Sequence, residues 1–219
     1  MPKAVLWDLD GTLIDSAEHH WRAWRETMSA EGIEISREQF LATFGQRNGA
    51  IIPAWLGKRT TPLAIQRIGE AKEDRYRRLV REQGVAAAPG AADWLRRLRG
   101  EGWRQAVASS APRLNIETVL EALGLGRFFD AIVSAEDVRR GKPDPQVFLA
   151  AANRLGVEPR DCIVVEDAPA GVEAAKRAGI RCIAAGPPGP LGAADLVVAD
   201  LSQLEDDAFD RLRGRPGSP

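Results

Sequence analysis

A short apolar run near the start of the chain, which leads directly into two aspartates, is the feature that most constrains the fold. Residues 4–7 are all apolar, as is typical of a strand buried on both faces of a parallel sheet. Asp8 and Asp10 follow, and residues two apart in an extended chain point to the same side. Gly11 then allows the backbone to turn sharply. We therefore expect both carboxylates to enter one space at the carboxyl edge of a parallel sheet, where open α/β folds bind ligands.

This pattern alone has an ordinary alternative. An Asp-x-Asp-Gly sequence is common in turns, because aspartate side chains form local hydrogen bonds there. Two close carboxylates also repel each other unless a cation or a proton joins them. A metal and phosphate site is therefore a hypothesis that the rest of the chain must support.

The composition indicates an ordinary globular protein with a small-molecule partner. The 219 residues are 44% hydrophobic and 28% charged, which allows one sizeable core and a smaller appendage. The net charge of -1 provides no global field for nucleic acid or an anionic membrane. Neither a long apolar leader nor a run of roughly 20 apolar residues occurs. We expect a monomeric, cytoplasmic protein, whose two cysteines are buried and reduced.

Residues 16–83 have helical periodicity and contain no convincing strand. Ser36 and Gln39 match a capping box, and Thr61 followed by Pro62 is a typical helix start. The predicted helices cover residues 16–30, 36–44, 50–56 and 61–83. We interpret residues 16–83 as an inserted helical cap.

From Ala88 onward, strand and helix patterns alternate. Strands are predicted at residues 104–108, 131–134, 162–165, 181–185 and 196–199, and helices at 91–99, from Pro112 to Leu123, around 148–155 and at 170–178. This alternation predicts βαβ units with right-handed crossovers and a mostly parallel sheet. The expected fold class is α/β, with a Rossmann-like core at 1–15 and 84–213 and an inserted α-helical cap. We expect residues 214–219 to form a disordered tail, because they include no apolar side chain to bury.

Polar side chains follow four of the predicted strands, and in a parallel sheet these strand ends share one edge. They are Asp8 and Asp10 after the first, Ser109 and Ser110 after the second, Lys142 after the third, and Glu166 and Asp167 after the fourth.

The charges at this edge predict a metal-assisted phosphate chemistry. Four carboxylates face one lysine, so a dication is needed, and oxygen ligands favour a hard ion such as Mg²⁺. Asp8 could attack a phosphate and form an aspartyl-phosphate, while Asp10 exchanges protons with the leaving and attacking oxygens. Lys142 and Ser109 would hold the phosphate oxygens.

Four ordered motifs resemble those of the haloacid dehalogenase superfamily across the whole chain. They are Asp-Leu-Asp-Gly-Thr-Leu-Ile-Asp, Val-Ala-Ser-Ser, Gly-Lys-Pro-Asp-Pro and Val-Val-Glu-Asp-Ala-Pro-Ala-Gly. The resemblance implies that Asp8 is the nucleophile and Asp10 the general acid and base. It further implies phosphate binding by Ser109 and Lys142, with Ser110 beside them or capping the next helix. The implied Mg²⁺ ligands are Asp167 and the Asp10 carbonyl, and Asp8 is a further candidate ligand. Glu166 would either bind the ion or contact the residues that bind it.

Within this superfamily the chain is most similar to the β-phosphoglucomutase-like phosphatases. Residues 15–24 resemble the first cap helix and hinge of the mutase. His20 then either forms a hydrogen bond between the cap and the core or is exposed. Trp24 either packs inside the cap or forms a platform for the substrate. Arg47 and Lys72 fall near positions where such caps contact the far end of the substrate. Residues 109–113 differ from the mutase loop, and Thr12 gives the first motif its phosphatase-like form.

We therefore expect a Mg²⁺-dependent phosphatase that acts on a small phosphorylated metabolite, with a sugar phosphate favoured. A phosphosugar mutase is the first alternative, because it would share every core residue. A phosphoacceptor signalling domain also uses aspartate, Mg²⁺, hydroxyl and lysine at strand ends. Its aspartate would not be expected on the first strand, and a catalytically silent binder is disfavoured by the intact Asp8 and Asp10.

Overall fold

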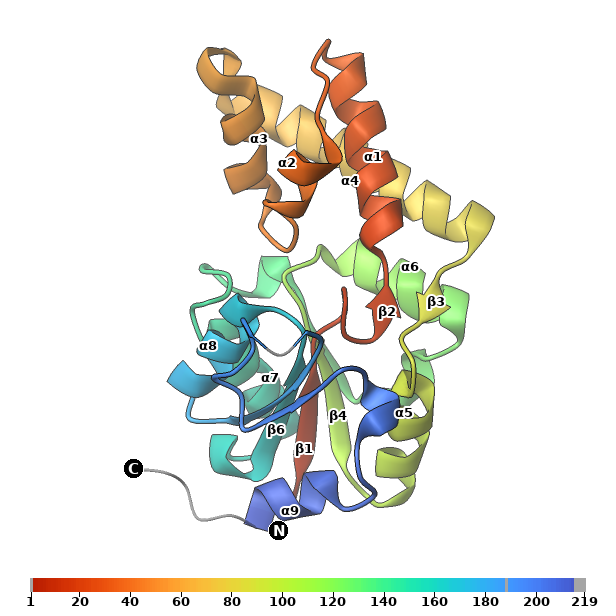
Figure 1. Cartoon of the computed structure of the whole chain (residues 1–219), viewed down its shortest axis with the longest axis vertical. Coiled ribbons are helices and arrows are strands. Elements are labelled where there is room, and N and C mark those ends of the chain that lie inside the picture. The colour runs from red at the N-terminus through yellow and green to blue at the C-terminus, as the bar shows by residue number, and fades with distance from the viewer. Residues whose placement is uncertain (1, 188, 215–219) are drawn as a thin grey trace.

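A six-stranded parallel sheet forms the centre of the molecule (Figure 1). The computed structural model describes residues 2–187 and 189–214. Each neighbouring pair of strands is parallel, with the first strand in the middle. The spatial order is β5 (Ala131–Val133), β4 (Arg104–Ala108), β1 (Ala4–Trp7), β6 (Cys162–Glu166), β7 (Arg181–Ala185) and β8 (Leu196–Val198). The predicted α/β class and parallel sheet are confirmed.

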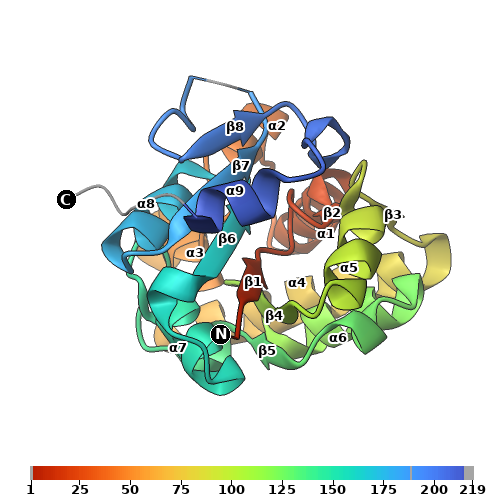
Figure 2. The same ribbon diagram turned by 90° about the horizontal axis from the view of Figure 1, so that it is seen from below.

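Strand β1 is apolar throughout because helices cover both faces of the sheet. Val5 and Trp7 point to one face, and Ala4 and Leu6 point to the other. The view from below shows helices on either side of the strands (Figure 2). The first face packs on α5 (Ala91–Gly100), α6 (Arg113–Leu123) and α9 (Ala208–Gly214), and the second on α7 (Gln146–Leu155) and α8 (Pro169–Arg177).

Helix α9 was not predicted, although it closes the first face of the core. Phe209 lies against three tryptophans, with ring centroids 5.0 Å from Trp94, 5.9 Å from Trp103 and 6.2 Å from Trp7. The helix includes Gly214, which the sequence placed in a disordered tail. That part of the prediction is wrong, and residues 215–219 lie outside the described residues.

Four helices form a cap above the carboxyl edge of the sheet (Figure 1). They are α1 (Ala17–Ala30), α2 (Arg37–Leu41), α3 (Asn48–Leu56) and α4 (Pro62–Gln83). The cap has an apolar cluster of its own, which includes Trp21, Trp24, Phe40 and Ile52. An inserted helical cap is therefore confirmed. The exact boundary at residues 83 and 84 stays a prediction, since Tyr76 and other residues near the end of α4 join the core cluster.

Local signals explain where the cap helices begin and end. Ser36 Oγ accepts from the Gln39 amide, and Gln39 Oε1 accepts from the Ser36 amide, as a capping box requires. Thr61 Oγ1 accepts from the amide of Ala64 and caps α4. Helix α2 is shorter than the predicted 36–44, because the chain leaves the helix after Leu41 and the Thr43 hydroxyl bonds the Phe40 carbonyl.

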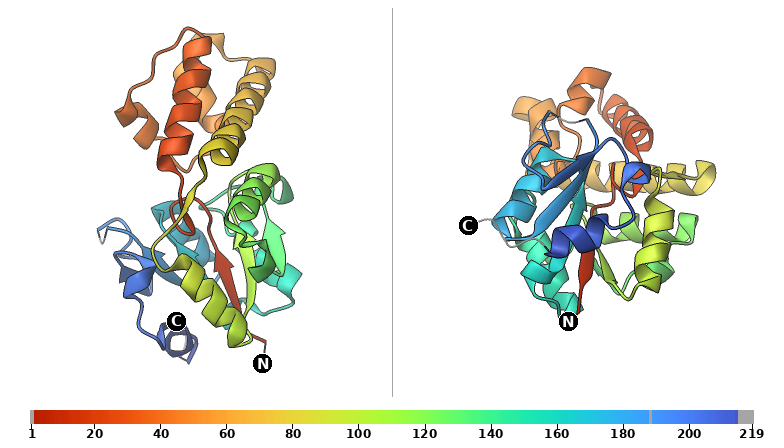
Figure 3. Two further views of the ribbon diagram at one scale, coloured as in Figure 1. Left: turned by 90° about the vertical axis from the view of Figure 1, so that its right-hand side faces the viewer. Right: turned by 60° about the horizontal axis from the view of Figure 1, so that its bottom comes forward.

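Two chain segments connect the cap to the core. Strand β2 (Ile14–Asp15) pairs antiparallel with β3 (Ala86–Ala87), and Figure 3 shows the two segments together between the cap and the sheet. Such short strands have no detectable sequence pattern and were not predicted. Single 3₁₀ turns complete the structure at Gly57–Arg59, Gly126–Phe128, Ala135–Asp137, Pro159–Asp161 and Leu201–Gln203. None of the described helices combines the length and apolar character needed to cross a membrane.

Candidate active site

Asp8 lies at the end of β1, where its side chain meets a buried lysine. The Asp8 amide donates to the Val165 carbonyl at 3.0 Å, which continues the pairing with β6. Lys142 Nζ donates to Asp8 Oδ1 and, at 2.5 Å, to Glu166 Oε1. Lys142 therefore bridges the ends of the neighbouring strands β1 and β6.

Three carboxylates form one cluster at this edge. Asp8, Glu166 and Asp167 each offer an oxygen, and these oxygens lie within 4.8 Å of one another. Glu166 is 1% exposed, and its Oε2 accepts from the amides of Asp167 and Ala168, both at 2.9 Å. The Thr12 hydroxyl donates to Asp167 Oδ1 at 3.2 Å. The cluster is thus held by backbone and side-chain donors.

Two glycines allow the backbone to approach these carboxylates. A Cβ on Gly11, which has a φ of +90°, would lie 2.0 Å from Asp167 Oδ2. A Cβ on Gly171 would lie 1.8 Å from Glu166 Oε1. A cavity of about 280 Å³ lies next to Gly11 and Asp167 and extends to Asp15 and Gly186. The cluster is therefore tightly enclosed at Gly11 and Gly171, and its member Asp167 borders the cavity.

The electrostatics of the cluster favour an additional cation. Burial raises the pKa of Asp8 well above its usual value despite the nearby Lys142, and Glu166 and Asp167 add to that rise. Burial and Glu166 raise the pKa of Asp167 to about 7. Burial alone would lower the pKa of Lys142, but Asp8 and Glu166 raise it. One ammonium therefore faces three carboxylates, and this all-oxygen donor set fits a hard divalent ion.

The Asp10 carboxylate is turned toward the cap and lies outside the three-carboxylate cluster. Its Oδ1 accepts from Ser16 Oγ at 2.5 Å, lies 3.2 Å from His20 Nε2, and is 3.5 Å from the Tyr76 hydroxyl. Burial opposes ionisation, but His20 and Ser16 lower the pKa of Asp10 below its usual value. Metal binding by Asp10 is limited to its predicted carbonyl contact, which stays a prediction.

Ser109 and Ser110 follow β4. Ser109 is 2% exposed, its amide donates to the Val133 carbonyl, and its Oγ accepts from the Ala111 amide at 3.0 Å. Ser110 is half-buried. It does not cap α6, since Pro112 occupies the capping position. Phosphate binding by either hydroxyl stays a prediction.

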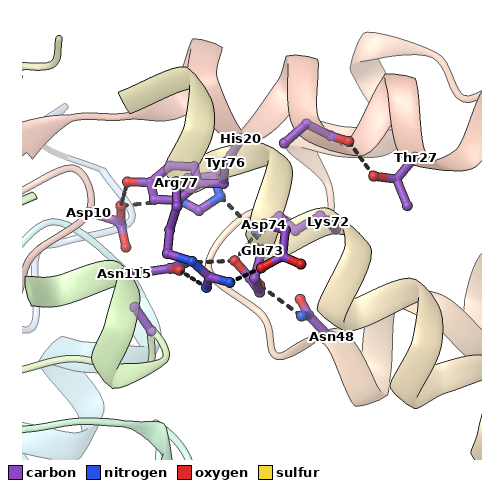
Figure 4. A network of polar contacts seen from close by, with 12 residues as sticks. Asp10, His20, Thr27, Asn48, Lys72, Glu73, Asp74, Tyr76, Arg77 and Asn115 are labelled. Carbon is purple, nitrogen blue, oxygen red and sulfur yellow. Dashed lines mark hydrogen bonds and ion pairs between the residues drawn. The ribbon is translucent and has the colours of Figure 1, made fainter. Parts of the chain in front are cut away.

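His20 and Lys72 meet inside the cap (Figure 4), and Trp24 lies beside Lys72. Lys72 Nζ lies 2.9 Å from His20 Nδ1 and 3.1 Å from both carboxylate oxygens of Glu73. The Lys72 side chain is buried, and its ammonium lies 5.3 Å from the ring centroid of Trp24. Trp24 itself packs edge-on against Trp55. His20 therefore connects the cap to Asp10, whereas substrate contacts of Lys72 and Trp24 stay predictions.

Arg47 reaches from the cap to the core. Its Nη2 donates to the Ala135 carbonyl at 3.4 Å, and its Nε lies 2.8 Å from the position of a Cβ on Gly141. Among the described residues, the buried Nε has no hydrogen-bond partner. Arg47 thus lies beside the loop that carries Lys142, and its contact with substrate stays a prediction.

Sequence reasoning missed several polar partners of this site. Ser16 and Tyr76 contact Asp10, and Glu73 and Asn115 extend the cap contacts toward α6. The only signal for Tyr76 was its position on the apolar stripe of α4, which predicts packing rather than a polar contact. Nothing in the local sequence indicated that Asn115, on a core helix, would meet a residue of the cap.

The comparisons with known proteins agree with this geometry. The family model "haloacid dehalogenase-like hydrolase" matches residues 2–179. Fructose-1-phosphate phosphatase YqaB of Escherichia coli is 31% identical, over 82% of this chain and 94% of that protein. The crystal structure of β-phosphoglucomutase from Clostridium difficile superposes with a TM-score of 0.88 at 28% identity, covering 97% of each chain.

A longer plant protein contains a similar stretch. Protein SUPPRESSOR OF QUENCHING 1, chloroplastic, of Arabidopsis thaliana is 38% identical over 93% of this chain, which spans only 19% of the plant protein. The family model and these relatives each match most of the chain. This chain belongs to the haloacid dehalogenase-like hydrolase family.

Proposed function

We propose that this protein is a Mg²⁺-dependent phosphatase that hydrolyses a small sugar phosphate through an aspartyl-phosphate on Asp8. The observation that carries this proposal is the buried Asp8 carboxylate, held by Lys142 beside Glu166 and Asp167 at the end of β1. A carboxylate placed in this way can act as a nucleophile, and a neighbouring lysine can neutralise the phosphate that it attacks.

In the first step, an Asp8 oxygen bonds to phosphorus and the bond between phosphorus and the ester oxygen breaks. Asp10 donates a proton to that leaving oxygen, so that the sugar departs as a neutral alcohol. Lys142 and Ser109 hold the remaining phosphate oxygens while negative charge shifts onto the leaving oxygen.

In the second step, water attacks the phosphorus of the aspartyl-phosphate, and Asp10 accepts a proton from that water. The bond between Asp8 and phosphorus breaks, which regenerates the carboxylate and releases inorganic phosphate. The cap excludes bulk water from the first step and selects the substrate.

Asp167, Asp8 and the Asp10 carbonyl would hold the magnesium ion, with Glu166 supporting them. The bound ion would supply positive charge that reduces the repulsion between Asp8 and the phosphate. The closely packed oxygens and the raised pKa of Asp167 support this assignment.

The names of similar proteins support a sugar phosphate as the substrate class. One relative is a fructose-1-phosphate phosphatase, and one similar structure is a β-phosphoglucomutase. The near-neutral net charge also favours a small molecule over a nucleic acid or a membrane surface.

Phosphate release from a panel of phosphorylated sugars, measured with Mg²⁺ and with EDTA, tests this proposal. Wild type should release phosphate only with metal, and both Asp8→Asn and Asp10→Asn should abolish turnover. Asp210→Asn, which alters an exposed aspartate paired with Lys3 just before β1, at the opposite end of the strand from Asp8, is the matched control and should retain full activity. Wild-type turnover equal to that of Asp8→Asn on every ester would refute the proposal.

A phosphosugar mutase is a second candidate, which the similarity to β-phosphoglucomutase favours. In that reaction Asp8 would return its phosphate to another sugar hydroxyl before water attacks. The same panel separates the two activities, because β-glucose 1-phosphate would yield glucose 6-phosphate with little free phosphate.

A further inference from the structure

Cap helix α4 lies along core helix α6, and polar side chains make many of the contacts between them. Glu73, Arg77 and Arg81 are spaced four residues apart and share one face of α4. Asn115 Nδ2 donates to Glu73 Oε2 at 2.6 Å, and Asn115 Oδ1 accepts from Arg77 Nη1 at 2.8 Å. Farther along the helices, Arg81 Nη2 donates to Thr118 Oγ1 at 3.3 Å. We call these five side chains the α4–α6 ladder.

Glu73 joins this ladder to the interior of the cap. It is 7% exposed, and its Oε1 accepts from Asn48 Nδ2 at 2.7 Å while its Oε2 accepts from Asn115. Both oxygens also lie 3.1 Å from Lys72 Nζ. Although burial opposes ionisation, Lys72 and the two amides lower the pKa of Glu73. Glu73 is therefore an anion whose described polar neighbours are all donors.

Buried contacts continue from Glu73 to the proposed acid and base (Figure 4). Lys72 Nζ lies 2.9 Å from His20 Nδ1, and His20 Nε2 lies 3.2 Å from Asp10 Oδ1. The His20 ring stacks on Tyr76 with centroids 4.0 Å apart, which fixes its plane. Asn115 of the core is thus linked to Asp10 by three cap side chains.

We propose that Glu73 is a positioning residue. When the cap contacts Asn115 of the core, Glu73 holds Asp10, through Lys72 and His20, in the orientation that proton transfer requires. Cap docking fixes Glu73, Glu73 fixes Lys72, and Lys72 fixes the His20 ring that contacts Asp10. The inference rests on the proposed function, because it takes Asp10 as the acid and base. The contact of Glu73 with Asn115 and the orientation of the Asp10 carboxylate are then linked through Lys72 and His20.

Two substitutions break the chain of contacts from opposite sides. Glu73→Gln keeps the side-chain shape but replaces one acceptor by a donor, so it cannot satisfy Asn48, Asn115 and Lys72 together. Asn115→Asp retains an acceptor for Arg77 and places a second carboxylate against Glu73. Thr118→Val is the matched control, because it removes a ladder contact that does not lead to Asp10.

The test compares esters that differ in their need for a proton donor, using the Mg²⁺-loaded full chain. One substrate is fructose 1-phosphate, replaced by the panel sugar phosphate with the highest kcat/KM if that is a different compound. The other is p-nitrophenyl phosphate, whose leaving group departs as a stable anion. A positioned general acid accelerates reactions by roughly 10²- to 10⁴-fold, so an alkyl ester should depend strongly on its alignment.

We expect Glu73→Gln and Asn115→Asp each to lower kcat for the sugar phosphate at least 10-fold. KM should change less than about 3-fold, because the variants lose acid catalysis rather than substrate binding. The first burst of p-nitrophenol should keep its rate within about 2-fold, because Asp8 attacks that ester without proton donation. Thr118→Val should match wild type on both esters.

Three results would overturn the inference. One is a wild-type kcat in both variants, and another is an equal loss on the two esters, which indicates a general structural role. The third is an effect confined to KM. If Glu73→Gln fails to fold, Asn115→Asp on the core helix still decides between these results. Wild type that is inactive on every ester would refute the proposed function itself, whereas active wild type with unaffected variants refutes only the role of Glu73.

Discussion

Gly171 lies directly against Glu166, so that a Cβ at position 171 would be 1.8 Å from Glu166 Oε1. The same oxygen accepts a hydrogen bond from Lys142, which also contacts Asp8. The backbone of α8, the acidic cluster and the lysine are therefore packed as one unit. Any side chain at position 171 must move Glu166, and movement of Glu166 disturbs Lys142.

Gly171→Ala should consequently weaken both metal-dependent activity and stability. Overpacking of this kind costs about 1–3 kcal/mol, and displacement of Glu166 should raise the Mg²⁺ concentration needed for half-maximal activity. Mg²⁺ titration of phosphate release and thermal unfolding measure the two effects. Gly100→Ala is the control, because its Cβ meets no atom within 4 Å. Equal behaviour of the two variants would contradict the packed unit described above.

Lys142→Met should lower kcat/KM by about 10²-fold or more, as expected when a charge-stabilising donor is lost from a buried site. The Lys142 ammonium is enclosed between Asp8 and Glu166, and its removal leaves two carboxylates facing each other. Inhibition by inorganic phosphate, measured beside turnover, should weaken in the same variant. Arg140→Met alters an exposed cation of the same loop and should change neither quantity. Unchanged phosphate inhibition in Lys142→Met would argue against phosphate binding by Lys142.

The metal-free protein should lose stability as the pH rises through neutrality. Burial and Glu166 raise the pKa of Asp167 to about 7, above the ordinary value of 3.8. Between these values the folded chain binds more protons than the unfolded chain, so the unfolding free energy falls as pH increases. This contribution is complete below about pH 4 and is lost above about pH 7.

Thermal unfolding in EDTA from pH 5 to pH 8 measures this effect. Asp167→Asn is the reference, because it shares the other titrating groups, including His20, whose pKa is lowered by burial and Lys72. The wild type should lose more Tm than Asp167→Asn over this range. Mg²⁺ at pH 8 should raise the wild-type Tm, since an ion that binds only the native state stabilises it. Parallel profiles for the two proteins would contradict the assigned pKa.

Phe209→Ala should destabilise the core by about 3–5 kcal/mol, the usual cost of removing a buried aromatic side chain. Phe209 is 2% exposed and contacts Trp7, Trp94 and Trp103. Denaturant unfolding followed by tryptophan fluorescence measures the change. Leu63→Ala, at a side chain that is 74% exposed, should have little effect. A small loss in Phe209→Ala would mean that α9 contributes little to the core.

The central architecture could be predicted because its signals are local and strong. The continuous apolar run of β1 requires a strand covered on both faces, and Asp8 follows it in the turn. The alternation of strands and helices then brings Lys142 and Glu166 to the same edge through topology alone. Sequence periodicity predicts this shared edge, whereas the strand order that places β1 beside β6 was not predicted.

Other features depend on contacts between distant segments. Helix α9 is short, and the burial of Phe209 and Leu212 depends on the core surface that they cover, which lies far away in the sequence. The direction of the Asp10 side chain depends on Ser16, His20 and Tyr76, which reach it from two cap helices and the connection before them. Strand alternation placed Asp10 beside Asp8, but the turn at Gly11 and these cap contacts direct its carboxylate elsewhere.

The central position of β1 also has a consequence for synthesis on the ribosome. The sheet partners of Val5 are Gln105 and Ile163, which are synthesised about 100 and about 160 residues after it. At typical elongation rates of roughly 5–20 residues per second, about 8–30 seconds pass before both neighbours of the strand have been synthesised. The helices between residues 17 and 83 have a separate apolar cluster and can assemble during this delay. The strand that leads to Asp8 is thus made well before the strands that enclose it, and its apolar side chains are exposed to aggregation during that interval.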